Sequence, residues 1–502
     1  MTEPEQKAAP AKAKKTSQKK RKKPFLRMNR IWMLFVIIVI EGYVVLSSEL
    51  LAIRQTLPFV GSGTDTVSII IAAVLMPLAV GYYKGGQFKP GLNKKTGKYK
   101  SVRKKLLFNI FIATLILFPA MSYAFLNLFF LGLYEIGIAY RAVLITIYCL
   151  VFIVTPVYLL GQTIPLVSNY FSKKRLSEIT GRMLFLSTMG SFLGAVFSTL
   201  VLMAFIGVHY TAAINFVLLA IIFTMLSRRK LSEKTLLFWA IAITAIAFNS
   251  GYVMKAFGVV ENNQYNTISV TEDEEGGRHL LMNSSDSSKL TPDGRKHDYI
   301  EFAEKVAVEP ILEANPPKDI LVVGAGAFTF GLEDHNNNYD FIDIDKTLRG
   351  IAEEYILRQE LSPNKIFKPI EARAYLSKTD KKYDVILLDA YFGDRTIPEY
   401  LVTKEFFLQV REHLKEDGIM LANFIISPNF ESKFSRHIDN TLRSAFPHVS
   451  RFVVNENFDL WNKDPYKVGN IIYMYKNMPA DQTNKIYTDD KNTMFLDKPQ
   501  KR

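Results

Sequence analysis

Apolar residues dominate the first half of the chain, in runs that are long enough to cross a bilayer. Such runs begin at residue 31 and recur at about 67–83, 106–131, 136–160, 183–206, 211–226 and 235–252. About twenty predominantly apolar residues are enough for a helix to span the hydrocarbon core. The pattern therefore predicts an α-helical, multi-span membrane region of about seven helices over residues 31–252.

In the second half of the chain, the apolar runs are shorter and alternate with polar residues. Residues 266–283 alternate between apolar and polar positions on either side of Gly276-Gly277, which predicts a β-hairpin within a small β-region and linking helix at 253–317. From Lys318 onward, expected strands alternate with expected helices. The strands are DILVVGAG, YDFIDID, IFKPIEARAYL, YDVILLDA and GIMLANFI, and the helices are TLRGIAEEYILRQ and TKEFFLQVREHL. This order predicts an α/β Rossmann-like (class I methyltransferase-like) domain over 318–480, with a doubly wound parallel sheet.

Charge divides the chain at the same place. Up to Tyr252 there are 30 Lys and Arg against 8 Asp and Glu, and the remainder has 32 against 40. The basic excess lies in a tail (1–30), which is expected to be disordered, and in short segments between apolar runs, as in membrane proteins. Nucleic acid is therefore not expected as a partner, whereas the lipid bilayer is. Residues 481–502 form a polar C-terminal tail.

The basic segments also predict an orientation. Lys and Arg gather in the tail, in 84–105, in 173–175 and in 228–230, and such segments stay on the cytoplasmic side. The expected location is the cell (inner) membrane, multi-pass, with the N-terminus cytoplasmic. Seven crossings would then place the C-terminal domain outside.

Three ionisable residues fall within or beside the first apolar run. Glu49 and Arg54 are expected to pair at the helix end, and Glu41 is expected to face the interior of the bundle, with a substrate path as the alternative. The single cysteine, Cys149, excludes an intrachain disulfide, and the seven histidines show no ligand spacing, so no metal site is expected.

Candidate chemistry gathers where the expected parallel strands end, because ligands of such sheets bind at the carboxyl ends of the strands. Gly324 and Gly326 follow the first strand, where a missing side chain lets a nucleotide approach the backbone. Asp343 ends the second strand, where a carboxylate can accept both hydroxyls of a ribose. Asp389 ends the buried strand YDVILLD, and an acid at such a place is paired, desolvated or functional.

Eight segments carry a family resemblance in the right order: ENNQYNTISV, RHLLMN, HDYIEF, ILVVGAG, FIDIDK, EARAYL, YDVILLDAYFGDRTIPEYLVTKEFF and GIMLANF. Together they resemble the spermidine synthase (polyamine aminopropyltransferase) family. More specifically, the chain resembles its membrane-bound branch, in which a multi-span region precedes that domain.

The resemblance implies a transferase of polyamine biosynthesis that moves an aminopropyl group to a small-molecule amine acceptor. Its co-substrate would be decarboxylated S-adenosylmethionine, with no permanently bound cofactor. By the same resemblance, Asp343 holds the ribose hydroxyls, Glu371 and its neighbour Ala372 read the adenine, Asp389 is the catalytic acid, and Tyr265 faces the amine.

The chain also departs from the family. GAGAFT places Ala327 where the family has an Asp that holds the aminopropyl amine, and in DAYFGD the second acid, Asp394, stands five residues after the first. Asp394, assigned to substrate binding, is one candidate for the missing carboxylate, beside Asp286 and Asp298. Two alternatives stay open: an S-adenosylmethionine-dependent methyltransferase, and a non-catalytic ligand-binding or transport protein. Association into a homo-oligomer also stays open.

The expected donor conflicts with the expected orientation. Adenosyl sulfonium donors are made in the cytosol, whereas seven crossings from a cytoplasmic tail export the domain. The cytosolic origin of the donor favours a cytoplasmic domain, which requires that one apolar segment does not cross.

Overall fold

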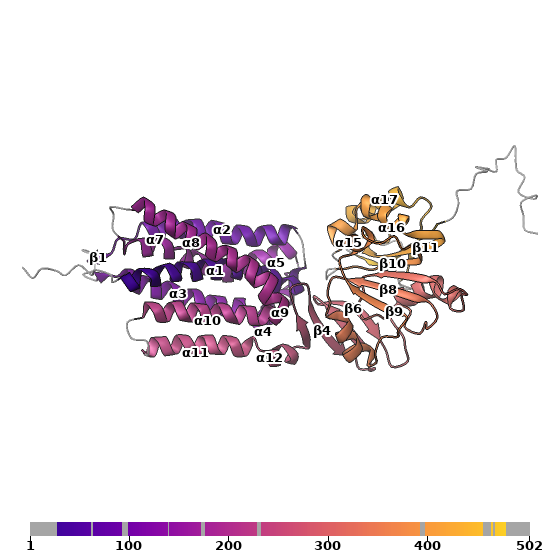
Figure 1. The fold of residues 1–502 in the computed structure, drawn as a ribbon, viewed down its shortest axis with the longest axis horizontal. Coiled ribbons are helices and arrows are strands. Elements are labelled where there is room, and N and C mark those ends of the chain that lie inside the picture. The colour runs from indigo at the N-terminus through magenta and orange to yellow at the C-terminus, as the bar shows by residue number, and fades with distance from the viewer. Residues whose placement is uncertain are drawn as a thin grey trace, which may run out of the picture.

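The computed structural model describes residues 28–61, 64–92, 99–138, 140–171, 176–227, 232–391, 397–454, 463–464 and 467–477. A long helical bundle is followed by an α/β part at one end of it (Figure 1). This division agrees with the change of apolar period near residue 252.

The helical part is built almost entirely from apolar helices, joined by short connections. The helices are α1 (Met28–Val60), α2 (Thr64–Gly86), α3 (Val102–Ala120), α4 (Tyr123–Glu135), α5 (Arg141–Tyr148), α6 (Val154–Gly161), α7 (Thr163–Ser168), α8 (Leu176–Phe197), α9 (Ala204–Ile206), α10 (Val208–Leu226), α11 (Glu233–Phe248) and α12 (Gly251–Ala256). The π-helical turns Cys149–Ile153 and Ser198–Met203 connect α5 to α6 and α8 to α9. A two-stranded ribbon, β1 (Gly91–Leu92) and β2 (Tyr99–Lys100), lies between α2 and α3.

Five helical stretches are long and apolar enough to cross a membrane. They are Ile31–Val60, Asp65–Gly86, Arg141–Ser168, Ser177–Ile206 and Val208–Leu226. A sixth is added if α3 and α4, which meet at a bend of 69°, count as one span. The seventh expected segment forms α11, which has 16 residues. The described residues thus hold five or six span-like helices by this measure, against about seven expected.

The long helical stretches of the described residues run side by side along the bundle (Figure 1). Arg54, near the end of α1, reaches the α/β part, whereas Phe35, near its beginning, stacks on Phe171 at the end of α7. The stretches α2, α3, α5–α7, α8–α9, α10 and α11 then alternate in direction (Figure 1). The start of α1 and the α/β part therefore lie at opposite ends of the bundle. A cytoplasmic α/β part requires that one of these stretches does not cross the membrane, and α11, with 16 residues, falls short of the length of the span-like helices.

Arg54 corrects a further expectation. Its Nε donates to the carbonyl oxygen of Asn263 at 2.8 Å and its Nη2 donates to Oγ1 of Thr267 at 3.4 Å. Within the described part of the chain it makes no ion pair with Glu49. The predicted helix-end pair is therefore wrong, because the loop before β4 offers the guanidinium backbone and hydroxyl oxygens. Glu41 is buried in the bundle, as expected.

A small antiparallel sheet opens the α/β part. Its strands are β3 (Val259–Asn262), β4 (Thr267–Glu272), β5 (Arg278–Met282) and β6 (Ser285–Leu290), in chain order. The expected hairpin is β4–β5, and Gly276 supplies the positive φ of 79° at its turn. Helix α13 (Asp298–Ala307) leads from this sheet to the larger one.

The larger sheet has seven strands in the order β12-β13-β11-β10-β7-β8-β9. These strands are β7 (Asp319–Val323), β8 (Asn338–Asp343), β9 (Lys365–Pro369), β10 (Tyr383–Leu388), β11 (Leu414–Ile426), β12 (Ser450–Val453) and β13 (Gly469–Lys476). Strands β9, β8, β7, β10 and β11 are parallel, which confirms the Rossmann-like, methyltransferase-like prediction. The sheet is mixed rather than parallel throughout, because β13 runs antiparallel between β11 and β12.

Helices cover both faces of this sheet. One core contains residues of α13 and α14 (Leu348–Ile351), and the other contains residues of α15 (Ala372–Leu376), α16 (Lys404–Glu412) and α17 (Lys433–Ala445). One expectation fails here: IFKPIEARAYL is not one strand, because β9 ends at Pro369 and EARAYL becomes α15. Both carboxylate oxygens of Glu371 accept backbone N–H groups of Arg373 and Ala374, at 3.0 and 2.7 Å, and this cap starts the helix.

The path of the chain predicts the sidedness of the protein. The ends of α2 and α10, which precede basic segments of the sequence, lie at the end of the bundle remote from the α/β part (Figure 1), so the positive-inside rule predicts that this end faces the cytoplasm. In a Cys149→Ala background, we expect a cysteine at exposed Gln359 to be labelled by an impermeant maleimide in intact spheroplasts. A cysteine at exposed Gln87, at the end of α2, is the matched control and should react only after permeabilisation. The reverse labelling pattern would contradict this orientation.

Candidate functional site

The site is centred where the carboxyl ends of β7 and β10 touch. Gly324 follows β7 with a φ of 94°, and a Cβ atom built there would lie 2.2 Å from the carbonyl oxygen of Asp389. Only glycine fits this backbone and this contact. This close approach brings the loop after β7 against the end of β10. The carboxylate of Asp389 therefore lies next to that loop.

The glycine loop is also held by the small sheet. Oγ of Ser288, on β6, accepts the backbone N–H of Ala327 at 2.9 Å, and a Cβ on Gly326 would lie 2.5 Å from the same oxygen. Ala327, which replaces the expected Asp, is fully buried in the core. Ala327 thus packs in the hydrophobic core at the position where the family has a carboxylate.

Two chambers lie at these strand ends and share Met282, Gly324, Asp343 and Tyr391. The Glu371 chamber, of about 70 Å³, is further lined by Tyr265, Glu371, Ala372 and Tyr400. The Asp389 chamber, of about 110 Å³, is further lined by Asp286, His297, Tyr299, Asp389 and Asn423. A ligand that extends past Asp343 would occupy both.

Asp343 stands at the boundary of the two chambers, at the end of β8. It accepts backbone N–H groups of Ala325 at 3.2 Å and Asp345 at 3.0 Å. Burial raises the pKa of its carboxyl to about 6, and these hydrogen bonds offset only part of that effect. The carboxylate keeps acceptor capacity towards the chambers, where hydroxyl groups of a ligand could bind.

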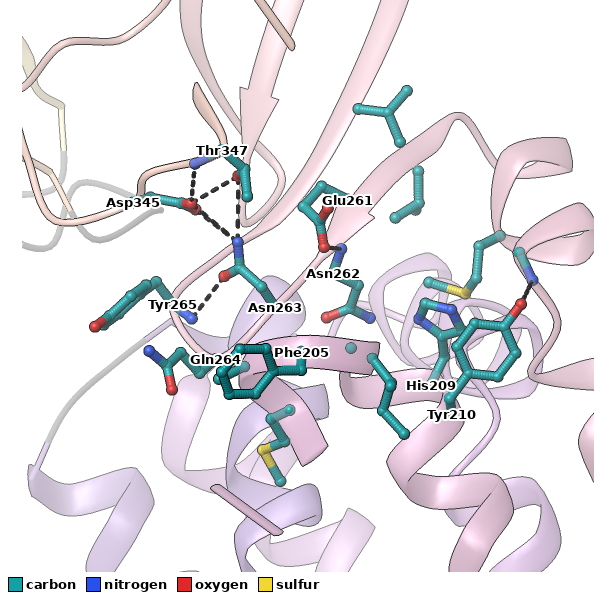
Figure 2. Close-up of a pocket in the computed structure, with 18 of the residues that line it drawn as sticks. Phe205, His209, Tyr210, Glu261, Asn262, Asn263, Gln264, Tyr265, Asp345 and Thr347 are labelled. Atoms are coloured by element: carbon teal, nitrogen blue, oxygen red, sulfur yellow. Dashed lines mark hydrogen bonds between the residues drawn. The ribbon is translucent and has the colours of Figure 1, made fainter. Parts of the chain in front are cut away.

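Asp345, two residues further, has a different role. It is completely buried and accepts hydrogen bonds from the side-chain amides of Asn263 and Asn266 and from the N–H and hydroxyl of Thr347. Asn263 in turn accepts the N–H of Tyr265 at 2.8 Å, as Figure 2 shows. Asp345 therefore builds the loop that presents Tyr265.

Asp389 is the central carboxylate of the second chamber. Tyr299 donates its hydroxyl to Oδ2 at 3.0 Å, and the amide of Asn423 donates to Oδ1 at 2.9 Å. Burial raises the pKa of Asp389, and the two hydrogen bonds oppose this. The pKa of the buried Tyr299 phenol lies well above its usual value, so this group stays protonated as a donor. A carboxylate with a raised pKa is suited to accept a proton near neutral pH.

Asp286 joins Asp389 in this chamber. It contacts Nδ1 of His279 at 2.8 Å and Nε2 of His297 at 3.3 Å. Burial opposes its ionisation, but the hydrogen bonds and charges of the two histidines lower the pKa of Asp286 overall. Of the carboxylates considered as substitutes for the missing Asp, Asp286 lies in the chamber, Asp298 is exposed outside it, and Asp394 falls outside the described residues.

The remaining predicted residues take these places. Gly324 and Asp343 line both chambers and Gly326 lines the Asp389 chamber. Glu371 and Ala372 line the other, although the Glu371 carboxylate also caps α15. Tyr265 lines the Glu371 chamber rather than the one that holds Asp389.

Sequence reasoning missed Tyr299, His297, Asn423 and Tyr391. Asn423 lies at the same level of β11 as Asp389 lies on β10, so the strand-end rule that selected Asp389 could have found it. Tyr391 stands two residues after Asp389 and donates to the Asn423 carbonyl at 3.1 Å. His297 and Tyr299 lie in HDYIEF, one of the segments that carry the resemblance, but the strand-end rule could not place them because they come from the start of α13.

Charge defines what the two chambers can hold. The described residues that line them include Asp286, Asp343, Glu371 and Asp389 but no Lys or Arg. Within the described part of the chain, no cluster of three His, Cys, Asp or Glu residues could hold a metal ion. The chambers thus suit an organic cation with hydroxyl groups to donate.

These features define the class of the C-terminal part as a Rossmann-like, methyltransferase-like domain with two chambers at its strand ends. Residues 301–455 match the spermine/spermidine synthase domain family. The C-terminal part of this chain therefore carries a spermidine synthase (polyamine aminopropyltransferase) domain, fused to a region of membrane-span-like helices. Tyr265, Asp286, His297 and Tyr299 precede the matched segment.

Individual relatives match only in part. The polyamine aminopropyltransferase of Vibrio vulnificus is 32% identical over 178 residues, which are 34% of this chain and 54% of that protein. The polyamine aminopropyltransferase of Oceanobacillus iheyensis is 27% identical over 197 residues, 37% of each chain. Spermidine synthase from Thermotoga maritima superposes with a TM-score of 0.33 at 18% identity, over 46% of this chain and 80% of that chain. The chain thus spans about half or less of the length of these curated relatives.

The contact at Gly324 generates a stability prediction. Gly324→Ala forces a side chain into a positive-φ position and against the Asp389 carbonyl, so we expect a loss of at least about 1–3 kcal/mol in the free energy of unfolding. Gly350→Ala is the matched control, because its Cβ meets nothing within 4 Å on α14, and it should stabilise by about 0.5–1 kcal/mol. Thermal unfolding followed by circular dichroism tests both, and equal stability of the two variants would contradict the packing described.

Proposed function

We propose that the protein is a membrane-bound aminopropyltransferase, which transfers the aminopropyl group of decarboxylated S-adenosylmethionine to an amine acceptor. The observation that carries this proposal is the group of four carboxylates at two adjoining chambers whose described lining holds no Lys or Arg. Both partners of this reaction are cations, and the family of the domain uses this donor.

Under this proposal, each residue acts on the part of the donor that its chamber would hold. Asp343 accepts the ribose hydroxyls at the boundary, and the adenine lies in the Glu371 chamber, where Glu371 and Ala372 contact it. The aminopropyl chain then extends towards Asp389, and Asp286 supplies the carboxylate that the family has at the position of Ala327. Gly324 and Gly326 keep the backbone close enough to line this path.

The transfer step forms one C–N bond and breaks one C–S bond. The lone pair of a neutral acceptor nitrogen attacks the aminopropyl carbon bonded to sulfur, the C–S bond breaks, and its electron pair stays on sulfur as methylthioadenosine. Before this attack, Asp389, oriented by Tyr299 and Asn423, holds the protonated acceptor amine and takes one of its protons, which frees the lone pair. The product nitrogen is left as a secondary ammonium, and Asp389 returns its proton to solvent.

The donor of a methyltransferase differs from the donor proposed here by one negative charge. S-adenosylmethionine carries a carboxylate, which would meet several acids here, whereas the decarboxylated donor presents only cations. We therefore expect the decarboxylated nucleoside to bind more tightly than S-adenosylmethionine. If the α/β part faces away from the cytoplasm, the donor must reach that face, so the labelling experiment above also identifies the side of supply.

Binding of the nucleoside should depend on Asp343. Asp343→Asn removes the charge from the ribose contacts, so we expect methylthioadenosine to bind more weakly by about 1.5–3 kcal/mol in calorimetry. With a pKa of about 6, Asp343 gains a proton as the pH falls from 7.5 to 5, so the affinity of the unsubstituted protein should fall over that range while that of Asp343→Asn stays level. Exposed Asp380→Asn is the control and should behave like the parent. Equal affinities for parent and Asp343→Asn would refute the ribose assignment.

Catalysis should depend on Asp389. Asp389→Asn keeps the shape of the side chain but loses its charge and basicity, so we expect methylthioadenosine release to slow by about 10²–10⁴-fold, with nucleoside affinity changed far less. Release from the decarboxylated donor is measured with putrescine and with a long-chain alkylamine as acceptors, beside Asp380→Asn. A folded Asp389→Asn protein with undiminished turnover would remove Asp389 from the mechanism.

A further inference from the structure

A much larger cavity lies where the helical bundle meets the α/β part. This junction cavity, of about 1100 Å³, is bounded by α9, α10 and α12 on one side and by the loop between β3 and β4 and the end of β8 on the other. Figure 2 shows Phe205, His209 and Tyr210 of the bundle facing Glu261 to Tyr265 of the α/β part.

One wall of the junction cavity is apolar and belongs to span-like helices. Phe205, Ile206, Ile214 and Val217 contribute to it, and Phe205 is 76% exposed. An aromatic side chain so exposed on a span-like helix faces lipid or a ligand. This wall therefore suits an alkyl or acyl chain.

The opposite wall is polar and carries charges of both signs. Glu261, Lys255 and Lys346 line the cavity, and no ion pair joins any of the three to another described residue. The Lys346 ammonium lies over the Phe205 ring, with Nζ 5.6 Å from the ring centroid, and this cation–π contact joins the two walls. In addition, the buried Nδ1 atom of His209 has no hydrogen-bond partner among the described residues. Burial and the nearby charge of Asp345 raise the pKa of Glu261, as expected for a carboxylate that lacks a cationic partner.

The junction cavity adjoins the candidate active site. Tyr265 and Ile344 line both this cavity and the Glu371 chamber, so these two residues form the partition between them. The polar wall is the wall next to the partition. A molecule held with its chain among the helices would therefore have its polar end beside the donor site.

We propose that the junction cavity binds the acceptor, and that the acceptor is an amphipathic amine: an apolar chain against α9 and α10, and a cationic head at Glu261 beside Tyr265. The transfer to this amine rests on the proposed function, whereas its binding does not. To react, the head leaves Glu261 and passes the partition at Tyr265 to reach Asp389, where its nitrogen becomes the nucleophile of the step described above, with the same bonds formed and broken. The amine comes either from an aminophospholipid of the bilayer or from a free long-chain amine, and the same site chemistry serves both.

Binding is tested on the full chain in phosphatidylcholine nanodiscs. Equilibrium binding of radiolabelled alkylamines from butylamine to dodecylamine is measured, with empty nanodiscs subtracted. Each methylene buried against the apolar wall should raise the affinity about fourfold. A diamine without an apolar chain should bind the junction cavity far more weakly than dodecylamine.

Two substitutions locate the site. Ala204→Trp, on the apolar wall, should abolish the dependence of affinity on chain length, and Glu261→Gln should weaken dodecylamine binding about tenfold or more at every chain length, as expected for a lost charge-assisted contact. Their matched controls are Ala72→Trp, at an exposed position of α2, and Glu274→Gln, at an exposed turn. All four variants should keep the affinity for methylthioadenosine. Unchanged alkylamine binding in Ala204→Trp and Glu261→Gln would overturn the inference.

Two further results separate this inference from the proposed function. Methylthioadenosine binding and turnover of putrescine, without saturable dodecylamine binding, would leave the function and refute the amphipathic acceptor. Dodecylamine binding that responds to both variants, without nucleoside binding, would refute the function and retain the cavity assignment. Competition by phosphatidylethanolamine in the nanodisc would assign the bilayer source, and its absence would assign a free amine.

Discussion

A short series of buried polar contacts joins the helical bundle, the loop of the small antiparallel sheet and the large sheet. Arg54 of α1 holds the carbonyl of Asn263, the amide of Asn263 holds Asp345, and Asp345 follows the second strand of the large sheet. Each of these groups is buried, so each would be costly without its partners. Because Asn263 also orients Tyr265, the same contacts determine the partition between the candidate active site and the junction cavity.

Two carboxylates of the candidate site are destabilised in their ionised form, because they are buried without a countercharge from Lys or Arg in the described lining. Burial raises the pKa values of Asp343 and Asp389, which means that the ionised forms are less stable there than in water. A sulfonium or ammonium ligand reverses this penalty, because it supplies the countercharge that the described lining lacks. The protein would gain from cationic ligands the stabilisation that it does not provide for itself.

Features with a local period could be predicted from the sequence, and features made by distant contacts could not. Apolar runs indicated the span-like helices, and strand ends indicated Gly324, Asp343 and Asp389, because each depends on neighbouring residues. The helix at EARAYL was missed because the cap at Glu371 outweighs the apolar alternation. The partner of Arg54, the arrival of Asp286 and Tyr299 beside Asp389, and the reversed β13 all depend on residues that the fold brings together from afar.

The contact between Arg54 and Asn263 links residues 209 positions apart in the chain. Contacts of such sequence separation form late, because much of the intervening chain must first be in place. During synthesis, α1 is complete long before residue 263 exists, so Arg54 lacks this acceptor until more than two hundred further residues have been made. The contact can therefore form only when the bundle and the α/β part have come together.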